Sequence, residues 1–255
     1  MALTVDHGGG ALITRTKPDD EDDLLTVLVG EDKHEFVFNR GTICKKSEFF
    51  RAACAGNWKE SAEKIVHLPE AHKEIFGAYS DFLRTGKVSL NIKGVSDVEK
   101  ETNQHKKQMY DRFIVAYALG DMLLDASFRN VVMDELKSWM DTYRTNVFHA
   151  NLKTAYDMVL PSSKLMQFFI DQWVDANYEK DSFRTYSEGL PHEFVLELAC
   201  VWSEERNVDR RKRLAERKTR REGTCTYHDH QSAVEETQYA LDGMDAGLAL
   251  LAASH

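Results

Sequence analysis

Residues 44–54, "CKKSEFFRAAC", decide how the first half of this chain is interpreted. Two cysteines and two lysines are residue types found in redox, metal and nucleophile sites. The paired phenylalanines, Phe49 and Phe50, are instead typical of a segment that packs into a core. Ser47 lies between the two cysteines and just before the phenylalanines, where its side-chain oxygen can cap the start of a short helix. The segment therefore leaves two classes of protein open, an enzyme and an interaction module, and its interpretation decides between them.

The spacing within this segment favours the core interpretation. Cys54 follows Phe50 by four residues, so both lie on one face of a helix. Free cysteine on an apolar face usually behaves as a small hydrophobic residue. Lys45 and Lys46 beside Cys44 could lower the pKa of its thiol in principle, but no nearby histidine is placed as a base. We interpret both thiols as core residues and keep a thiol enzyme as the alternative.

Two strands are expected before this segment and a third after it. Residues 23–30, "DLLTVLVG", and 34–39, "HEFVFN", are rich in β-branched and aromatic side chains and are joined by a polar turn. They predict an antiparallel hairpin. Asn39, at its end, is a helix cap. Downstream, "KIVHLPE" predicts a short strand that ends at Pro69.

Helical periodicity dominates the rest of the chain. Residues 71–84 carry apolar side chains at helical spacing, and Thr85-Gly86 ends that helix. Residues 91–107 are polar and lack periodicity, which predicts a loop or insertion. Further on, four apolar stripes predict buried helices: Tyr110, Phe113, Ile114 and Tyr117; Phe128, Val131, Val132, Leu136 and Met140; Leu165, Phe168, Phe169 and Trp173; Phe194, Val195, Leu198 and Trp202.

This order of elements predicts an α+β fold. Strands come first and helices later, so we expect a small sheet packed with a cluster of helices, followed by an all-helical extension. Alternating βαβ units, which would form a parallel sheet, are not indicated.

Composition narrows the function and the compartment. The 255 residues carry a formal net charge of -9, which argues against nucleic-acid binding as the main activity. The N-terminus does not read as a signal peptide, and the longest apolar stretches fall short of a bilayer's thickness. The 4 cysteines form no CxxC pair. We expect reduced thiols, a cytoplasmic or nuclear location and no membrane partner.

Common catalytic and cofactor motifs are missing from the sequence. Glycine-rich phosphate loops, HExxH and GxSxG do not occur. We therefore expect no catalytic residue, no cofactor, no bound metal and no small-molecule substrate.

The tail offers one alternative to that expectation. Cys225, His228 and His230 in "CTYHDH" could contribute ligands to a zinc site, although a closed structural site needs four. A polar surface strand or turn explains the same residues and is favoured.

Residues 206–222, "RNVDRRKRLAERKTRRE", form the one dense basic stretch. It could direct nuclear import, with residues 210–213 at its centre. Asp209 with Arg213 and Glu216 with Arg220 are acid-to-base pairs four residues apart, which favours a solvated helix. Both interpretations can hold together.

The ordered string of motifs resembles the BTB/POZ domain, especially its fungal single-domain branch. A hairpin is followed by a Ser-x-Phe-Phe element between two short helices, by a strand ending in Leu-Pro-Glu, and by a helix ending in Thr-Gly. The resemblance covers about residues 23–142. The family-motif and core positions are Asp23, Cys44, Ser47, Phe49, Phe50, Leu68, Pro69, Glu70, Thr85 and Gly86.

The resemblance implies four segments: a flexible leader over 1–22, a BTB/POZ-like domain over 23–142 that contains the polar insertion, a helical extension over 143–205, and a basic helix and tail over 206–255. It also implies a non-enzymatic module that binds proteins, homodimerises through its first helices and delivers substrates to a cullin-based ubiquitin ligase. A nuclear or transcriptional regulator assembled by the same domain is the alternative. A thiol- or zinc-dependent enzyme is the third candidate.

Overall fold

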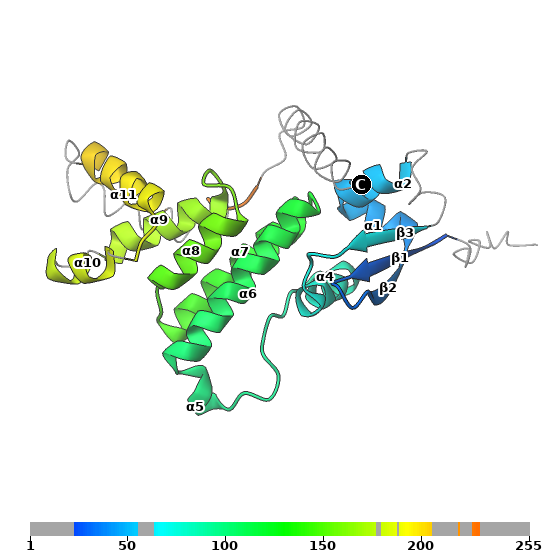
Figure 1. Cartoon of the computed structure of the whole chain (residues 1–255), viewed down its shortest axis with the longest axis horizontal. Coiled ribbons are helices and arrows are strands. Elements are labelled where there is room, and N and C mark those ends of the chain that lie inside the picture. Colours follow the sequence, from blue (N-terminus) through cyan, green and yellow to red (C-terminus); the bar gives the residue numbers. More distant parts are fainter. Residues whose placement is uncertain are drawn as a thin grey trace, which may run out of the picture.

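Figure 1 shows the computed structural model, which describes residues 23–55, 64–176, 180–187, 189–205, 219 and 226–229. The sheet and its helices are β1 (Leu24–Val29), β2 (His34–Asn39), α1 (Arg40–Lys46), α2 (Glu48–Ala55), β3 (Ile65–Leu68) and α4 (Lys73–Thr85). The later helices are α5 (Asp97–Lys100), α6 (Asn103–Met122), α7 (Ala126–Tyr143), α8 (His149–Met158), α9 (Lys164–Ala176), α10 (Lys180–Ser187) and α11 (His192–Glu205). The chain has an α+β fold with a helical extension.

The sheet has the order β2-β1-β3, with β2 antiparallel and β3 parallel to β1. Alternate residues of β1 point into the core: Leu25, Val27 and Val29 are at most 1% exposed. Val27 lies opposite Phe36 on one side and Val66 on the other, so one apolar row crosses all three strands. The predicted hairpin and the strand ending before Pro69 are confirmed.

Three predicted helix boundaries are also confirmed. The Asn39 side chain accepts a hydrogen bond from the Thr42 amide of α1 at 3.1 Å. The Phe50 amide donates to the Ser47 hydroxyl at 3.1 Å, which caps α2. Gly86 ends α4 with φ 72°, a left-handed conformation that costs glycine little.

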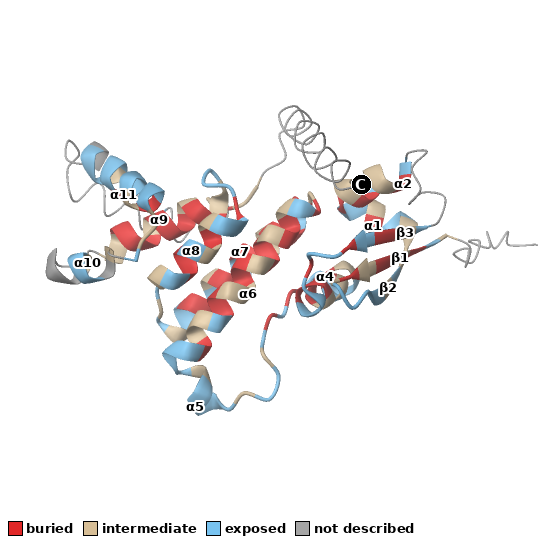
Figure 2. Ribbon diagram, viewed as in Figure 1, coloured by how far each residue is buried: buried red, intermediate tan, exposed pale blue. Residues whose placement is uncertain are grey.

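One hydrophobic core joins the sheet to the helical extension (Figure 2). The Phe128 ring of α7 lies 4.9 Å from Tyr79 and 5.2 Å from Phe82, both on α4. Farther from the sheet, Tyr110 of α6 meets Trp139 of α7 at 5.2 Å and Phe169 of α9 at 6.4 Å. The predicted stripes on α6, α7 and α9 are therefore largely buried.

The loop prediction over residues 91–107 is wrong in its second half. Ser96 and Glu99 form a capping box at the start of α5, with Ser96 accepting from the Glu99 amide and Glu99 accepting from the Ser96 amide. Thr102 then caps α6, which begins at Asn103. The first residues of α5 and α6 show no apolar periodicity because polar caps, and not core packing, stabilise them.

The fourth apolar stripe is buried only in part. Phe194 and Leu198 of α11 are fully buried, but Trp202 is 38% exposed. Trp202 lies near the end of α11, where its ring meets Phe183 of α10 at 5.3 Å. Where a helix extends beyond the core, apolar positions at helical spacing are no longer covered by other elements. The periodicity therefore overstated the burial of Trp202.

Candidate interaction surfaces

Ser47 ties the first two helices to the end of α6. Its hydroxyl donates to the Leu123 carbonyl at the end of α6 at 2.6 Å and accepts from the Phe50 amide, and the side chain is fully buried. The Phe49 amide also points to the Leu123 carbonyl, at 3.4 Å. A buried hydroxyl with one donated and one accepted bond is fully satisfied. The serine of the Ser-x-Phe-Phe element therefore acts as a structural joint.

The other motif residues do not gather into one site. Phe50 and Leu68 are in the core, and Phe49 and Cys44 are half-buried beside it. Asp23 forms an ion pair with Arg40 at 3.7 Å at the mouth of the hairpin. The exposed motif residues lie in the turns that flank α4: Pro69, Glu70, Thr85 and Gly86.

A second buried joint, which sequence reasoning did not identify, is centred on Asp125. Its carboxylate accepts from the Tyr79 hydroxyl of α4 at 3.1 Å and from the Phe128 amide at 2.9 Å. Burial, followed by the nearby charge of Asp125, raises the pKa of Tyr79 above its ordinary value, so the phenol keeps its proton. An aspartate just before an apolar helical stripe was the available signal.

The two thiols of residues 44–54 are packed as expected for core residues. Cys54 is 6% exposed, and the Cys44 thiol lies 3.4 Å from the Phe50 carbonyl. Burial, with a smaller contribution from Cys54, raises the pKa of Cys44 to about 12. Lys45 and Lys46 are exposed, and neither contributes to the shift in the pKa of the Cys44 thiol. The possibility that these lysines lower that pKa is therefore wrong.

This raised pKa predicts slow alkylation of Cys44. At pH 8 a thiol with a pKa of about 12 holds over 100-fold less thiolate than an ordinary cysteine, and the thiolate is the reactive species. Peptide mapping after timed iodoacetamide treatment should show Cys44 reacting far more slowly than the exposed Cys200. Equal rates at the two positions would restore the thiol-enzyme alternative.

The outer face of the sheet carries exposed apolar side chains. Val37 of β2, Thr26 of β1 and Ile65 of β3 lie in one row across the three strands. Val37 is 52% exposed, and Leu24, a diagonal neighbour on β1, is 44% exposed. We call Leu24, Thr26, Leu28, Val37 and Ile65 the outer sheet face.

By contrast, the exposed positions of the first helices are mostly polar or small. On α1 they are Gly41, Thr42, Lys45 and Lys46, and on α2 they include Arg51, which pairs with Glu48 at 3.0 Å. Two exposed large hydrophobic side chains, Leu24 and Val37, therefore lie on the outer sheet face, and none lies on the described surfaces of α1 and α2.

The candidate zinc ligands are only partly described. His228 Nε2 lies 2.9 Å from an Asp134 carboxylate oxygen, whereas Cys225 and His230 lie outside the described residues. Among the residues that are described, no three His, Cys, Asp or Glu side chains form a group suited to a metal ion. The basic stretch around 210–213 is also outside that part of the chain.

Two comparisons leave the family open. No protein-family model and no curated protein matches this chain. In the parts of the chain that the structure describes, none of the helices has the length and apolar content needed to cross a membrane. Assignment to the BTB/POZ family therefore stays a prediction.

Proposed function

We propose that this chain is a non-catalytic protein-interaction module of the BTB/POZ type. The observation that carries this proposal is the outer sheet face, where apolar side chains are presented on a rigid sheet whose opposite face is the core. The sequence of hairpin, two short helices, strand and helix supports the same class. The half-buried Cys44 thiol with its raised pKa argues against thiol catalysis.

Self-association through the outer sheet face is the first activity to test. The Val37→Glu variant places a charge at the centre of the face, and burying an unpaired charge in an interface is costly. Light scattering after size exclusion should show a dimer for the wild-type chain and a monomer for Val37→Glu. Glu35→Gln, on the same strand and already exposed and polar, is the matched control and should remain dimeric.

A monomeric wild-type chain would contradict self-association. A Val37→Glu variant that stays dimeric, with unchanged thermal unfolding, would contradict the outer sheet face as the interface. Pull-down with a purified cullin scaffold then separates the two forms of this proposal. A substrate adaptor should retain the cullin, whereas a nuclear regulator that uses the module only for assembly should not.

A further inference from the structure

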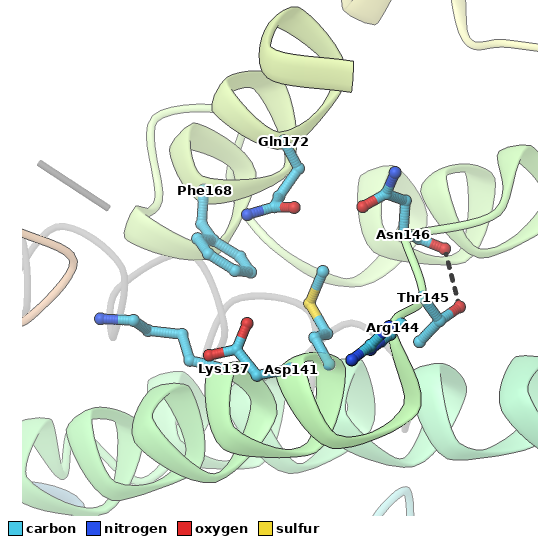
Figure 3. Close-up of a pocket in the computed structure, with 8 residues that line it drawn as sticks. Lys137, Asp141, Arg144, Thr145, Asn146, Phe168 and Gln172 are labelled. Atoms are coloured by element: carbon cyan, nitrogen blue, oxygen red, sulfur yellow. Dashed lines mark hydrogen bonds between the residues drawn. The ribbon is translucent and has the colours of Figure 1, made fainter. Parts of the chain in front are cut away.

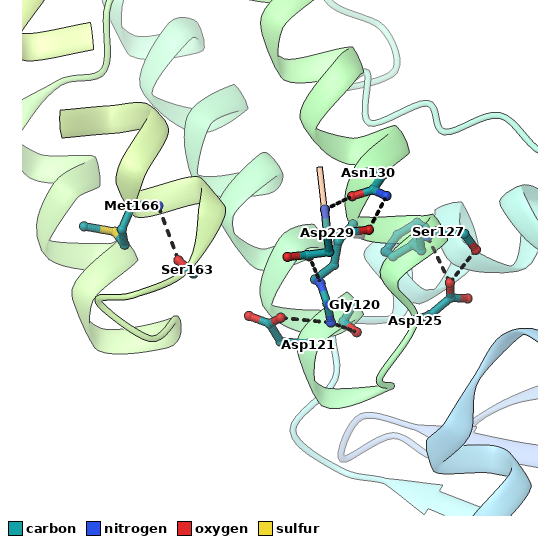
Figure 4. A network of polar contacts seen from close by, with 10 residues as sticks. Gly120, Asp121, Asp125, Ser127, Asn130, Ser163, Met166 and Asp229 are labelled. Carbon is teal, nitrogen blue, oxygen red and sulfur yellow. Dashed lines mark hydrogen bonds and ion pairs between the residues drawn. The ribbon is translucent and has the colours of Figure 1, made fainter. Parts of the chain in front are cut away.

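A short tail segment, residues 226–229, contacts both α7 and α9. Figure 4 shows Asp229 of this segment beside Asn130 of α7. Tyr227 is 2% exposed, and its ring meets Phe168 of α9 at 5.0 Å. Its hydroxyl donates to the Asp171 carboxylate at 2.8 Å, and the Lys137 ammonium of α7 lies 5.8 Å from the ring centroid. The ring of Tyr227 thus has apolar and cationic neighbours, and its hydroxyl has a hydrogen-bond acceptor, as is typical of anchoring side chains in peptide ligands.

The peptide backbone of this segment is held by Asn130 of α7. The Asn130 side-chain amide donates to the Asp229 carbonyl at 3.1 Å, and the Asp229 amide donates to the Asn130 side-chain oxygen at 2.8 Å. Paired bonds to the amide and the carbonyl of Asp229 hold the backbone of that residue whatever its side chain, directly after a turn at residues 226–228. This contact supplies orientation, and the neighbouring side chains supply specificity.

The Asp229 carboxylate enters a buried charge cluster. Arg129, 8% exposed, bonds Asp229 at 2.6 Å through Nε and pairs with Asp121 at 3.1 Å through Nη1. Burial raises the pKa of Asp121 to about 6, Arg129 opposes that rise, and the charge of Asp229 adds to it. The buried guanidinium is thus built to hold a carboxylate delivered by the segment.

These contacts give the segment a direction along α7. Asp229 lies at Arg129 and Asn130, His228 at Asp134, and Tyr227 at Lys137. From Tyr227 to Asp229 the segment therefore runs antiparallel to α7, with Tyr227 nearer the C-terminal end of that helix.

A cavity of about 230 Å³ lies at that end (Figure 3). It shares Lys137 and Phe168 with the Tyr227 contacts and continues to Asp141, Arg144 and Gln172. The cavity has both charged and apolar walls, so it suits one more side chain of a bound peptide on the N-terminal side of the tyrosine.

We propose that α7 and α9 form a recognition site for a peptide of pattern Tyr-x-Asp held in a turn, and that residues 226–229 occupy it in cis as a built-in competitor. The ligand in trans is a protein segment with a hydroxyl-bearing aromatic residue, followed two residues later by an aspartate. This site uses other elements than the outer sheet face, so it goes beyond the proposed function.

Peptide binding to the full-length chain tests this proposal. The probe is a fluorescein-labelled peptide covering residues 223–231 with serine in place of Cys225, and the readout is anisotropy. A tethered segment competes at a high effective concentration, so the Tyr227→Ala/Asp229→Ala variant should bind the probe about ten-fold or more tightly than wild type. Adding Asn130→Ala to that variant should reverse the gain, whereas adding Ser138→Ala, at an exposed position of α7, should not.

The outcomes separate the occupants of the site. Equal affinity for wild type and the double variant would overturn competition in cis, and affinity unaffected by Asn130→Ala or by replacing the probe's tyrosine would overturn the site itself. If light scattering showed a dimer for the wild-type chain and a monomer for the Tyr227→Ala/Asp229→Ala variant, the segment would instead be exchanged between two copies of the chain. That result differs from the Val37→Glu result, so the two proposals can fail separately.

Discussion

Phe50→Ala is expected to lower the free energy of unfolding by about 3–5 kcal/mol, because it leaves a large cavity in a packed core. Phe50 is fully buried, and its ring meets Phe49 at 5.2 Å in a T-shaped arrangement. The variant keeps the backbone amide that bonds Ser47, so the cap of α2 is retained. Urea unfolding followed by far-UV circular dichroism gives the measurement.

Arg51→Ala is the matched control for this prediction. Arg51 lies on the same helix, is exposed, and makes a surface ion pair with Glu48. Its replacement should cost less than about 1 kcal/mol, since surface pairs contribute little. If Phe50→Ala cost no more than this control, the core interpretation of residues 44–54 would be wrong.

Asp125→Ala is expected to cost about 3 kcal/mol, the sum of a lost helix cap and a buried hydroxyl left without its acceptor. The carboxylate is fully buried and accepts from Tyr79 and from the Phe128 amide. Its removal loosens both the start of α7 and the contact between α7 and α4. Chemical denaturation of the variant and the wild type measures the difference.

A double-mutant cycle with Tyr79→Phe separates the two parts of this cost. In the Tyr79→Phe background no hydroxyl is stranded, so Asp125→Ala should cost about 1 kcal/mol less than it does in the wild type. The remaining cost is that of the lost cap together with the lost bond from the Ser127 hydroxyl, which donates to Asp125 at 2.6 Å. Strictly additive effects would mean that the bond between Tyr79 and Asp125 adds nothing to the stability of the joint.

Local rules predicted the sheet and the first helices well. The hairpin, the caps at Asn39 and Ser47, and the helix end at Gly86 depend on residues within a few positions of one another. The burial of Phe50 and Cys54 likewise follows from one helical period. Such features need no knowledge of the rest of the chain, which is why sequence alone was sufficient.

Polar contacts between distant segments could not be predicted in this way. The bond from Ser47 to Leu123 spans 76 residues and that from Arg129 to Asp229 spans 100, and neither pair has a periodic signature. His228 was singled out in the sequence as a candidate zinc ligand, but the structure places it on Asp134. The residue type was informative, while its partner depended on the tertiary fold.

The turn between α6 and α7 couples the contacts of the tail to the contacts of the sheet. Leu123 and Asp125 in this turn hold the sheet half through Ser47 and Tyr79. Asp121 and the Gly120 carbonyl, in the last turn of α6, hold Arg129, which itself bonds Asp229. Because both sets of bonds share one stretch of backbone, any free energy that tail release transfers to this turn must act reciprocally on ligand binding at the sheet.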